Sequence, residues 1–379
     1  EEKLDCNLEL IAFKNGVYDL ENFEFRDGRP EDYISISTNI DYDEESDFTE
    51  EIKEIKLFFK QVYPNENVYN YVLTLLASFL NGSTGNEKFH VFTGTGGNGK
   101  SKVIELYESV IGEYSVKLPH TVITQKRPSS NSSTPEIIRT KGKRFACLQE
   151  PDENEKIQVG FMKELTGGDK IVARGLFKDP IEFKPQFKMV LTCNKLPRIP
   201  GNDGGTWRRI RVLDHPSRFV ENPKASNEYL IDMQLSEKMI KWKQPFMKLL
   251  IQYYKLYKKG DIEKGILPGI KEPAEVLAVT ENYRKFNDIY AEFIIDTVEE
   301  YSNGIVKIEE IYAIFKKWYK DAYSETKVPV RKELKDYMEK IYGPYGNGKK
   351  SGFRGIQIIN KDDDDDNEEG AEPGTQQYL

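Results

Sequence analysis

The fold class is decided by one stretch of sequence, Phe89-His90-Val91-Phe92-Thr93-Gly94-Thr95-Gly96-Gly97-Asn98-Gly99-Lys100-Ser101. It begins with a short, largely apolar run that is typical of a buried strand, and it continues into the full pattern GxxxxGK[ST]. Beyond this stretch, apolar side chains recur at the spacing of one helix face: Val103, Ile104, Tyr107 and Val110. Because the pattern binds phosphate when it joins a strand to a helix, we predict a phosphate-binding loop in an α/β fold. The alternative is a glycine-rich turn that matches by chance.

Each part of this loop has an expected role in holding a nucleoside triphosphate. The glycines let backbone N–H groups turn towards the phosphates, and the N-terminus of the following helix adds a favourable dipole. Lys100 is expected to neutralise the β and γ phosphates, and Ser101 to place its hydroxyl on Mg²⁺. We therefore predict ATP and Mg²⁺ as cofactors, with nucleotide binding by Gly94, Thr95, Gly96, Gly97, Asn98, Gly99, Lys100 and Ser101.

A catalytic carboxylate is expected at the end of a neighbouring strand, where it can organise Mg²⁺ and polarise the attacking water. The run Phe145-Ala146-Cys147-Leu148-Gln149-Glu150 is typical of a buried strand with its acid at the tip, and Pro151 ends it. We predict that Glu150 is a catalytic and metal-binding residue. A plain surface carboxylate is the alternative, and Asp152 and Glu153 are further candidates for the acid.

A third polar group follows the next apolar run, Lys188-Met189-Val190-Leu191-Thr192-Cys193-Asn194. An asparagine at a strand end is commonly a turn former. Here Asn194 comes third in the order phosphate loop, carboxylate, asparagine, so we predict that it holds the lytic water or senses the γ-phosphate.

A paired arginine follows in Trp207-Arg208-Arg209-Ile210-Arg211. We predict that Arg208 or Arg209 acts as an arginine finger on the nucleotide of a neighbouring subunit. The sequence leaves open which of the two does so. The alternatives are a solvated basic strand, or arginines that pair with Asp203 and Asp214.

The segments around the loop predict a chain of several parts. Phe13-Lys14-Asn15-Gly16-Val17-Tyr18 predicts a hairpin in which Asn-Gly supplies two positive φ angles. Later strands alternate with helices, which favours a parallel sheet. Three helical stretches, Asp288–Glu300, Lys307–Tyr323 and Arg331–Ile341, precede a glycine-punctuated β segment. The predicted parts are an N-terminal β and helical collar region at 1–85, a P-loop ATPase core with a parallel sheet at 86–220, a helical segment and linker at 221–282, a winged-helix-like domain at 283–360 and an acidic disordered tail at 361–379.

Composition excludes some classes of protein. The 379 residues include 38% hydrophobic and 31% charged residues, which is typical of a globular protein. The net charge of −8 disfavours a broad nucleic-acid surface, although charge between Lys178 and Arg218 is locally basic. Three scattered cysteines argue against a disulfide framework or a zinc site. No signal peptide or apolar run of roughly 18 residues is present, so no membrane partner is expected. The chain starts at Glu1 without a methionine, and we expect it to be a fragment.

The motifs, taken together, resemble those of the superfamily 3 helicases, the AAA+ DNA helicases of DNA viruses and some plasmids. Gly94–Ser101, Glu150 and Asn194 correspond to motifs A, B and C of that family, and 161–178 is similar to its B′ segment. The primase–helicase branch of poxviruses and other large DNA viruses is most similar, over roughly 8–358. Further segments that carry this resemblance are Phe13–Asp19, Pro30-Glu31-Asp32-Tyr33, Thr166-Gly167-Gly168-Asp169 and Trp207-Arg208-Arg209-Ile210.

The resemblance implies a ring of six copies that moves 3′ to 5′ on single-stranded DNA, and a primase domain upstream in the full-length protein. It implies action at a viral replication site, in the cytoplasm or nucleus of the host cell. The B′ segment implies a β-hairpin that carries a DNA-contacting lysine. One departure is that Glu150 is followed by proline, where many relatives have two adjacent acids.

We place that hairpin near Leu176–Pro180, where Phe177-Lys178-Asp179-Pro180 is turn-like. Lys178 is expected to hold a DNA phosphate and Phe177 to pack on a sugar or base, with Lys170 and Arg174 as weaker candidates. An ordinary surface hairpin is the alternative.

The predicted function is an ATP-driven helicase of viral DNA replication, which moves as a ring on single-stranded DNA and unwinds forked duplex. Two other classes remain open: an AAA+ ATPase or loader that does not unwind, and a P-loop kinase-like enzyme.

Overall fold

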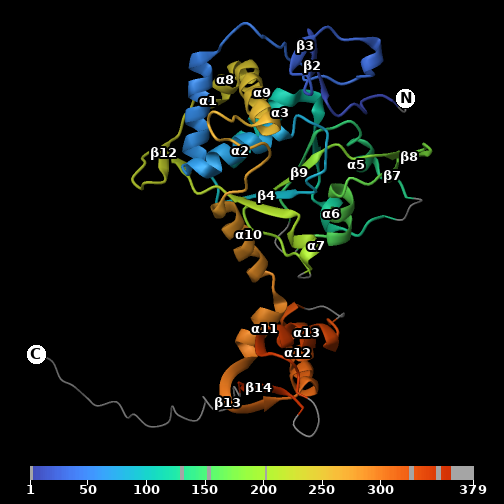
Figure 1. Ribbon diagram of the computed structural model, residues 1–379, viewed down its shortest axis with the longest axis vertical. Coiled ribbons are helices and arrows are strands. Elements are labelled where there is room, and N and C mark those ends of the chain that lie inside the picture. Colours follow the sequence, from blue (N-terminus) through green and yellow to red (C-terminus); the bar gives the residue numbers. More distant parts are fainter. Residues whose placement is uncertain are drawn as a thin grey trace, which may run out of the picture. The chain divides into compact units, whose positions relative to one another are not determined.

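The structure is a computed structural model that describes residues 3–128, 132–151, 155–200, 203–323, 328–346 and 351–359. The chain divides into two compact units, Glu1–Asn287 and Asp288–Leu379, each of which has its own core (Figure 1). The predicted acidic tail at 361–379 lies outside the described residues.

A parallel sheet forms the centre of the N-terminal unit, as predicted. Its strands lie in the order β10 (Ile210–Asp214), β4 (Phe89–Thr93), β9 (Lys188–Thr192), β6 (Phe145–Leu148) and β5 (Ser115–Leu118). Every pair in this sheet is parallel. Because both faces of the sheet are covered, its central strands are almost continuously apolar rather than alternating.

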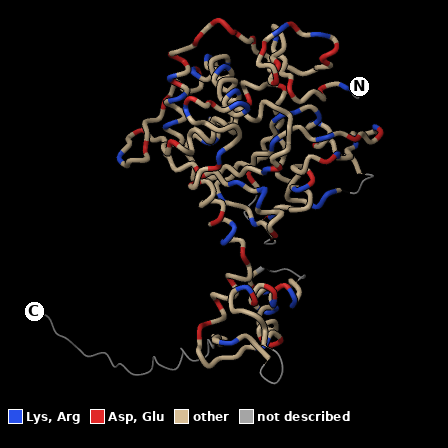
Figure 2. Tube along the Cα trace, viewed as in Figure 1, with Lys and Arg blue, Asp and Glu red and all other residues tan. Residues whose placement is uncertain are grey.

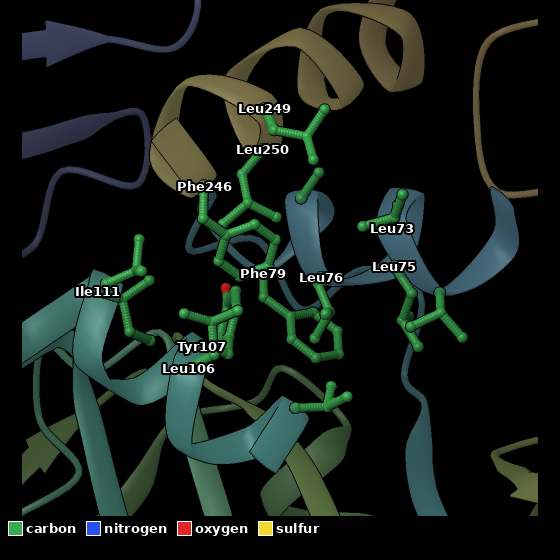
Figure 3. Packing of buried hydrophobic residues seen from close by; sticks show 14 of the residues in the cluster. Leu73, Leu75, Leu76, Phe79, Leu106, Tyr107, Ile111, Phe246, Leu249 and Leu250 are labelled. Carbon is green, nitrogen blue, oxygen red and sulfur yellow. The ribbon is translucent and has the colours of Figure 1, made fainter. Parts of the chain in front are cut away.

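The two faces of the sheet belong to two hydrophobic clusters, and successive strand residues alternate between them. On β6, Phe145 packs into the first cluster and Ala146 into the second. The first cluster joins the sheet to α1 (Thr49–Val62), α2 (Glu66–Ser78), α3 (Lys100–Ile111) and α9 (Lys243–Lys259). Figure 3 shows Phe79 and Leu76 of the collar side beside Tyr107 of α3 and Phe246 of α9, in the same cluster. The collar helices therefore share one core with the sheet.

The second face is covered by several short elements and by the longer helix α10 (Ala274–Phe286). The short elements are α4 (Thr121–Thr124), α5 (Pro135–Ile138), α6 (Val159–Thr166), the hairpin of β7 (Ile171–Arg174) and β8 (Pro180–Phe183), and α7 (Gly204–Trp207). Two short strands, β11 (Arg218–Val220) and β12 (Glu228–Leu230), pair in parallel before α8 (Leu235–Lys241). Within the described ranges, none of the helices combines the length and apolarity needed to cross a bilayer.

The N-terminal hairpin forms where predicted, but its turn differs. β1 (Leu10–Phe13) pairs antiparallel with β2 (Gly16–Asp19), which pairs with β3 (Glu24–Arg26). Neither Asn15 nor Gly16 has a positive φ, so that part of the prediction is wrong. Gly16 already belongs to the strand, and a methyl group there would lie 2.6 Å from the carbonyl oxygen of Arg26. Glycine is needed here for close approach rather than for a left-handed turn.

The described residues of the C-terminal unit form three helices and an antiparallel pair of strands, and the winged-helix-like assignment stays a prediction. Its elements are α11 (Ile289–Thr297), β13 (Val298–Val306), α12 (Ile308–Tyr323), α13 (Arg331–Tyr342) and β14 (Phe353–Ile358). The first predicted helix was expected to reach Glu300, but it ends at Thr297 and the chain continues as β13. Pairing of β13 with β14, far along the chain, explains why local periodicity missed this strand.

Candidate active site

The loop Gly94–Ser101, called here the P-loop, joins the end of β4 to the start of α3. Gly94, Gly97 and Gly99 have φ angles of +145°, +75° and +81°, a region that side chains rarely adopt. A methyl group on Gly94 would also collide with the side chain of Asn98. The glycines are therefore required by the backbone path, which leaves the loop at the N-terminus of α3.

Lys100 folds back over the P-loop. Its Nζ donates to the carbonyl oxygens of Gly94 at 3.3 Å and Cys193 at 2.5 Å, and to Asn194 Oδ1 at 3.0 Å. The side chain is 6% exposed, and this burial lowers the pKa of the Lys100 ammonium from its ordinary value. All three N–H donors of the ammonium are therefore hydrogen-bonded within this chain.

Glu150 and Asn194 meet beside this ammonium. The backbone N–H of Asn194 donates to Glu150 Oε1 at 2.6 Å, and Asn194 Nδ2 donates to Glu150 Oε2 at 3.1 Å. The two strands that lead to them are parallel neighbours, with Leu148 opposite Leu191, so their carboxyl ends meet at one edge of the sheet. The structure thus brings the three predicted residues into one chain of contacts. The other acid candidates, Asp152 and Glu153, lie outside the described residues.

Two further residues support the P-loop, and the sequence analysis missed both. His215 Nδ1 lies 2.9 Å from the carbonyl oxygen of Thr93, and Nε2 lies 2.7 Å from the hydroxyl of Tyr63. Burial lowers the pKa of His215 to about 3, so the imidazole is neutral at neutral pH. Since a carbonyl oxygen only accepts, Nδ1 carries the proton and Nε2 accepts from Tyr63. The collar helix α1, whose last residue precedes Tyr63, is thereby tied to the residue before Gly94.

A largely apolar pocket of about 630 Å³ lies beside the P-loop. Gly97 and Lys102 are among its lining residues, and the backbone N–H of Phe219 donates to the carbonyl oxygen of Gly97 at 2.7 Å. Leu57 of α1 and Trp242, just after α8, line other parts of it. The pocket therefore continues directly from the phosphate loop into the collar.

Arg208 and Arg209 lie at the amino ends of the strands, opposite the carboxyl ends where Glu150 and Asn194 meet. They directly precede β10, which runs parallel to β4 with Ile210 opposite Phe89, whereas the P-loop follows the far end of β4. A strand of this length spans roughly 15 Å. The structure therefore does not bring the paired arginines to the P-loop of their own chain. In place of the alternative pairing with Asp203 and Asp214, both arginines form ion pairs with Glu87, at 2.5 Å for Arg208 and 2.8 Å for Arg209.

The predicted hairpin is formed by β7 and β8 (Figure 1). Phe177, at its tip, is fully exposed and has a φ of +56°. The Nε of Arg174 donates to the carbonyl oxygen of Lys178 at 2.9 Å, which closes the turn. Figure 2 shows Lys and Arg interspersed with Asp and Glu along both units, so any contact with a polyanion depends on local groups such as these. The DNA-binding role of Lys178, Phe177 and Arg174 stays a prediction.

The chain is similar to several known proteins. Residues 1–62 match the family model described as "D5 N terminal like", and residues 92–209 match a family of unknown function, DUF5906. A protein of Acanthamoeba polyphaga mimivirus, provisionally named helicase L207/L206, is 41% identical over 89% of this chain and 35% of its own length. A provisionally named helicase, 184R, of Invertebrate iridescent virus 6 is 33% identical over 93% of this chain and 38% of its own.

More distant relatives carry a primase name. A provisionally named primase, C962R, of African swine fever virus is 23% identical over 95% of this chain and 38% of its own length. Among solved structures, the apo form of the NrS-1 C-terminal region is 11% identical with a TM-score of 0.46, over 88% of this chain and 69% of that one. The chain spans 35% to 38% of the length of the viral relatives named here. It is similar to a part of those longer proteins of large DNA viruses, which carry provisional helicase and primase names.

Proposed function

We propose that this chain is the motor part of a superfamily 3 DNA helicase of viral replication, an AAA+ ATPase that hydrolyses ATP and moves on single-stranded DNA. The observation that carries this proposal is the chain of contacts from Lys100 through Asn194 to Glu150 beside the P-loop. In the full-length protein, a primase domain upstream would supply primers. The motor would work as a homo-hexamer at the viral replication site of the infected cell.

The phosphate chemistry follows from these side chains. The Lys100 ammonium would exchange its carbonyl acceptors for β and γ phosphate oxygens, which carry more negative charge. Magnesium is usually held by one or two protein oxygens together with phosphates and water, and the exposed Ser101 hydroxyl and the Glu150 carboxylate are ligands of this kind. Asn194, which already orients Glu150, would hold the attacking water or the γ-phosphate.

The pocket beside the P-loop supports a nucleoside triphosphate rather than a simple phosphate as the ligand. Because Gly97 and Gly99 belong to the P-loop and also line the pocket, the base and ribose would enter between Leu57, Phe219 and Trp242. Its volume of about 630 Å³ lies in the range of ordinary small-molecule sites.

The DNA-binding part of the proposal rests on the hairpin of β7 and β8. Lys178 would hold a backbone phosphate, and the exposed ring of Phe177 would stack on a base or sugar. A loader or a kinase-like enzyme would share the P-loop chemistry without needing this hairpin.

One experiment separates these functions. We would measure the ATPase rate of the wild type, Lys100→Ala and Lys178→Ala, each with and without single-stranded DNA at low salt. A helicase predicts a wild-type rate that DNA raises, a loss of at least about 100-fold in Lys100→Ala, and a normal basal rate without DNA stimulation in Lys178→Ala. Hydrolysis that ignores DNA, together with no unwinding of a forked duplex, would favour the loader or kinase.

A further inference from the structure

We propose that Arg208, and not Arg209, is the arginine that this chain presents to the nucleotide of a neighbouring copy, and that Glu87 positions it. The inference deepens the proposed function and rests on it. Three observations on the two arginines and Glu87 carry the argument.

Arg209 is turned towards its own chain. Its Nη1 donates to the carbonyl oxygen of Gly205 at 2.7 Å, and its Nη2 lies 2.8 Å from Glu87 Oε2. The side chain is 12% exposed. Moving this guanidinium to another subunit would break both contacts and leave the half-buried Glu87 without one of its partners, so Arg209 supports the local structure.

Arg208 is anchored by its backbone while its side chain projects outward. Its carbonyl oxygen accepts from Lys88 Nζ at 2.8 Å, and the preceding Trp207 is buried against the ring of Tyr283. The side chain, in contrast, is 61% exposed and meets Glu87 Oε2 at 2.5 Å. An exposed ion pair of this kind contributes little stability, so it can be exchanged for a more highly charged phosphate.

Glu87 stands between the two guanidinium groups. Both reach the same oxygen, Oε2, so the carboxylate offsets the repulsion between two adjacent cations. Its φ of +51° is uncommon for a residue other than glycine, and its backbone N–H donates to Thr84 at 2.9 Å. The strand β4 begins two residues later, which fixes Glu87 relative to the sheet. Glu87 thus acts through Arg208 as a positioning residue.

The distance to the P-loop of the same chain makes the target a second copy. The arginines and the P-loop lie at opposite ends of the paired strands β4 and β10, roughly 15 Å apart along the strand. In a closed ring, each copy would offer its P-loop to one neighbour and its Arg208 to the other. A complete site therefore needs two chains.

Mixing of two variant subunits tests whether the P-loop and the arginine of one site come from different chains. We would co-express differently tagged Lys100→Ala and Arg208→Ala chains, purify the mixed assembly and compare its ATPase rate with each variant alone. Arg208→Ala alone should lose at least about 100-fold in kcat, because an arginine in trans contributes 10³ to 10⁵ in related phosphoryl transfer. The mixture should recover a measurable fraction of the wild-type ATPase rate, since a Lys100→Ala chain supplies Arg208 to the intact P-loop of an Arg208→Ala chain.

Arg209→Ala is the matched control. It should lower the melting temperature, whereas Arg208→Ala should change it by less than about 2 °C. Recovery of activity by Arg209→Ala but not by Arg208→Ala in mixtures with Lys100→Ala would overturn the assignment, as would an unchanged kcat in Arg208→Ala. A wild type without ATPase activity would remove the proposed function and this inference together. ATPase activity without DNA stimulation would remove only the helicase proposal.

Glu87→Gln tests the positioning role. It should lower kcat by about 10-fold while KM for ATP changes by less than about 2-fold, because the arginine is misplaced rather than lost. Glu87→Asp, which keeps the charge, should recover part of the loss. Equal kcat in Glu87→Gln and wild type would show that Glu87 does not position Arg208.

Discussion

The carboxyl and amino ends of the strands in the central sheet, called here its carboxyl edge and amino edge, differ in whether their charged and polar groups contact one another as a site within one chain. At the carboxyl edge, Lys100, Asn194 and Glu150 contact one another within a single chain, and a buried histidine fixes the loop behind them. At the amino edge, the guanidinium of Arg208 is largely exposed and is held by an ion pair with Glu87. The first edge has groups arranged to hold a ligand, whereas the second has an exposed cation. This difference is the basis of our proposal that catalysis is divided between copies of the chain.

The largest effect is expected for a change of the acid at the carboxyl edge, Glu150. Glu150→Gln removes the negative charge but keeps a group that can accept from Asn194. We expect kcat for ATP hydrolysis to fall by about 10²- to 10⁴-fold, because general-base and metal-organising functions are lost together, while nucleotide affinity is retained. The rate and the binding of a fluorescent ATP analogue would be measured in parallel.

Glu87→Gln is the control at the amino edge, with the same change of group and an expected loss of only about 10-fold. If Glu150→Gln kept near-normal hydrolysis, Glu150 would not be the catalytic acid, and attention would move to Asp152 and Glu153.

The carboxyl edge was largely predictable from the sequence, and the reason is topological. Parallel strands end at one edge, so polar residues that follow separate apolar runs must meet there, as Glu150 and Asn194 do. Tyr63 and Glu87 gave no such signal. Tyr63 lies 152 residues from His215 and Glu87 lies 121 from Arg208, and their approach depends on how collar and sheet pack.

The second prediction tests whether the collar sets the geometry of the carboxyl edge. Tyr63→Phe leaves the buried Nε2 of His215 without its donor. We expect a loss of about 1–3 kcal/mol in unfolding free energy, and a higher KM for ATP because the residue before Gly94 is less well fixed. Chemical denaturation and steady-state kinetics measure the two effects.

Tyr253→Phe is the matched control, because its hydroxyl donates to the exposed Asn70 at 3.3 Å, away from the P-loop. It should cost less than about 0.5 kcal/mol and leave KM unchanged. A Tyr63→Phe variant with wild-type KM would break the proposed link between the collar and the nucleotide.

The smallest expected effect compares two buried histidines, His90 within β4 and His215 directly after β10. Burial lowers the pKa of His215 and of His90 from 6.5 to about 3. His90 also lies near Arg211 and Lys88, towards the amino edge, while His215 contacts the residue before the P-loop. Since the unfolded chain binds these protons more readily, stability is full above pH 6.5 and falls as pH drops towards 3. Each histidine should remove about 0.7 kcal/mol between pH 7 and pH 6.

His90→Gln and His215→Gln should therefore flatten the pH dependence of unfolding by similar amounts, whatever their effects on stability at pH 7. They should differ in catalysis, because only His215 contacts Thr93 and Tyr63. We expect KM for ATP to rise in His215→Gln and to stay within about 2-fold of wild type in His90→Gln. Equal changes in KM would mean that the carboxyl edge responds to the stability of the whole sheet, and the contrast between the two edges would then not explain nucleotide binding.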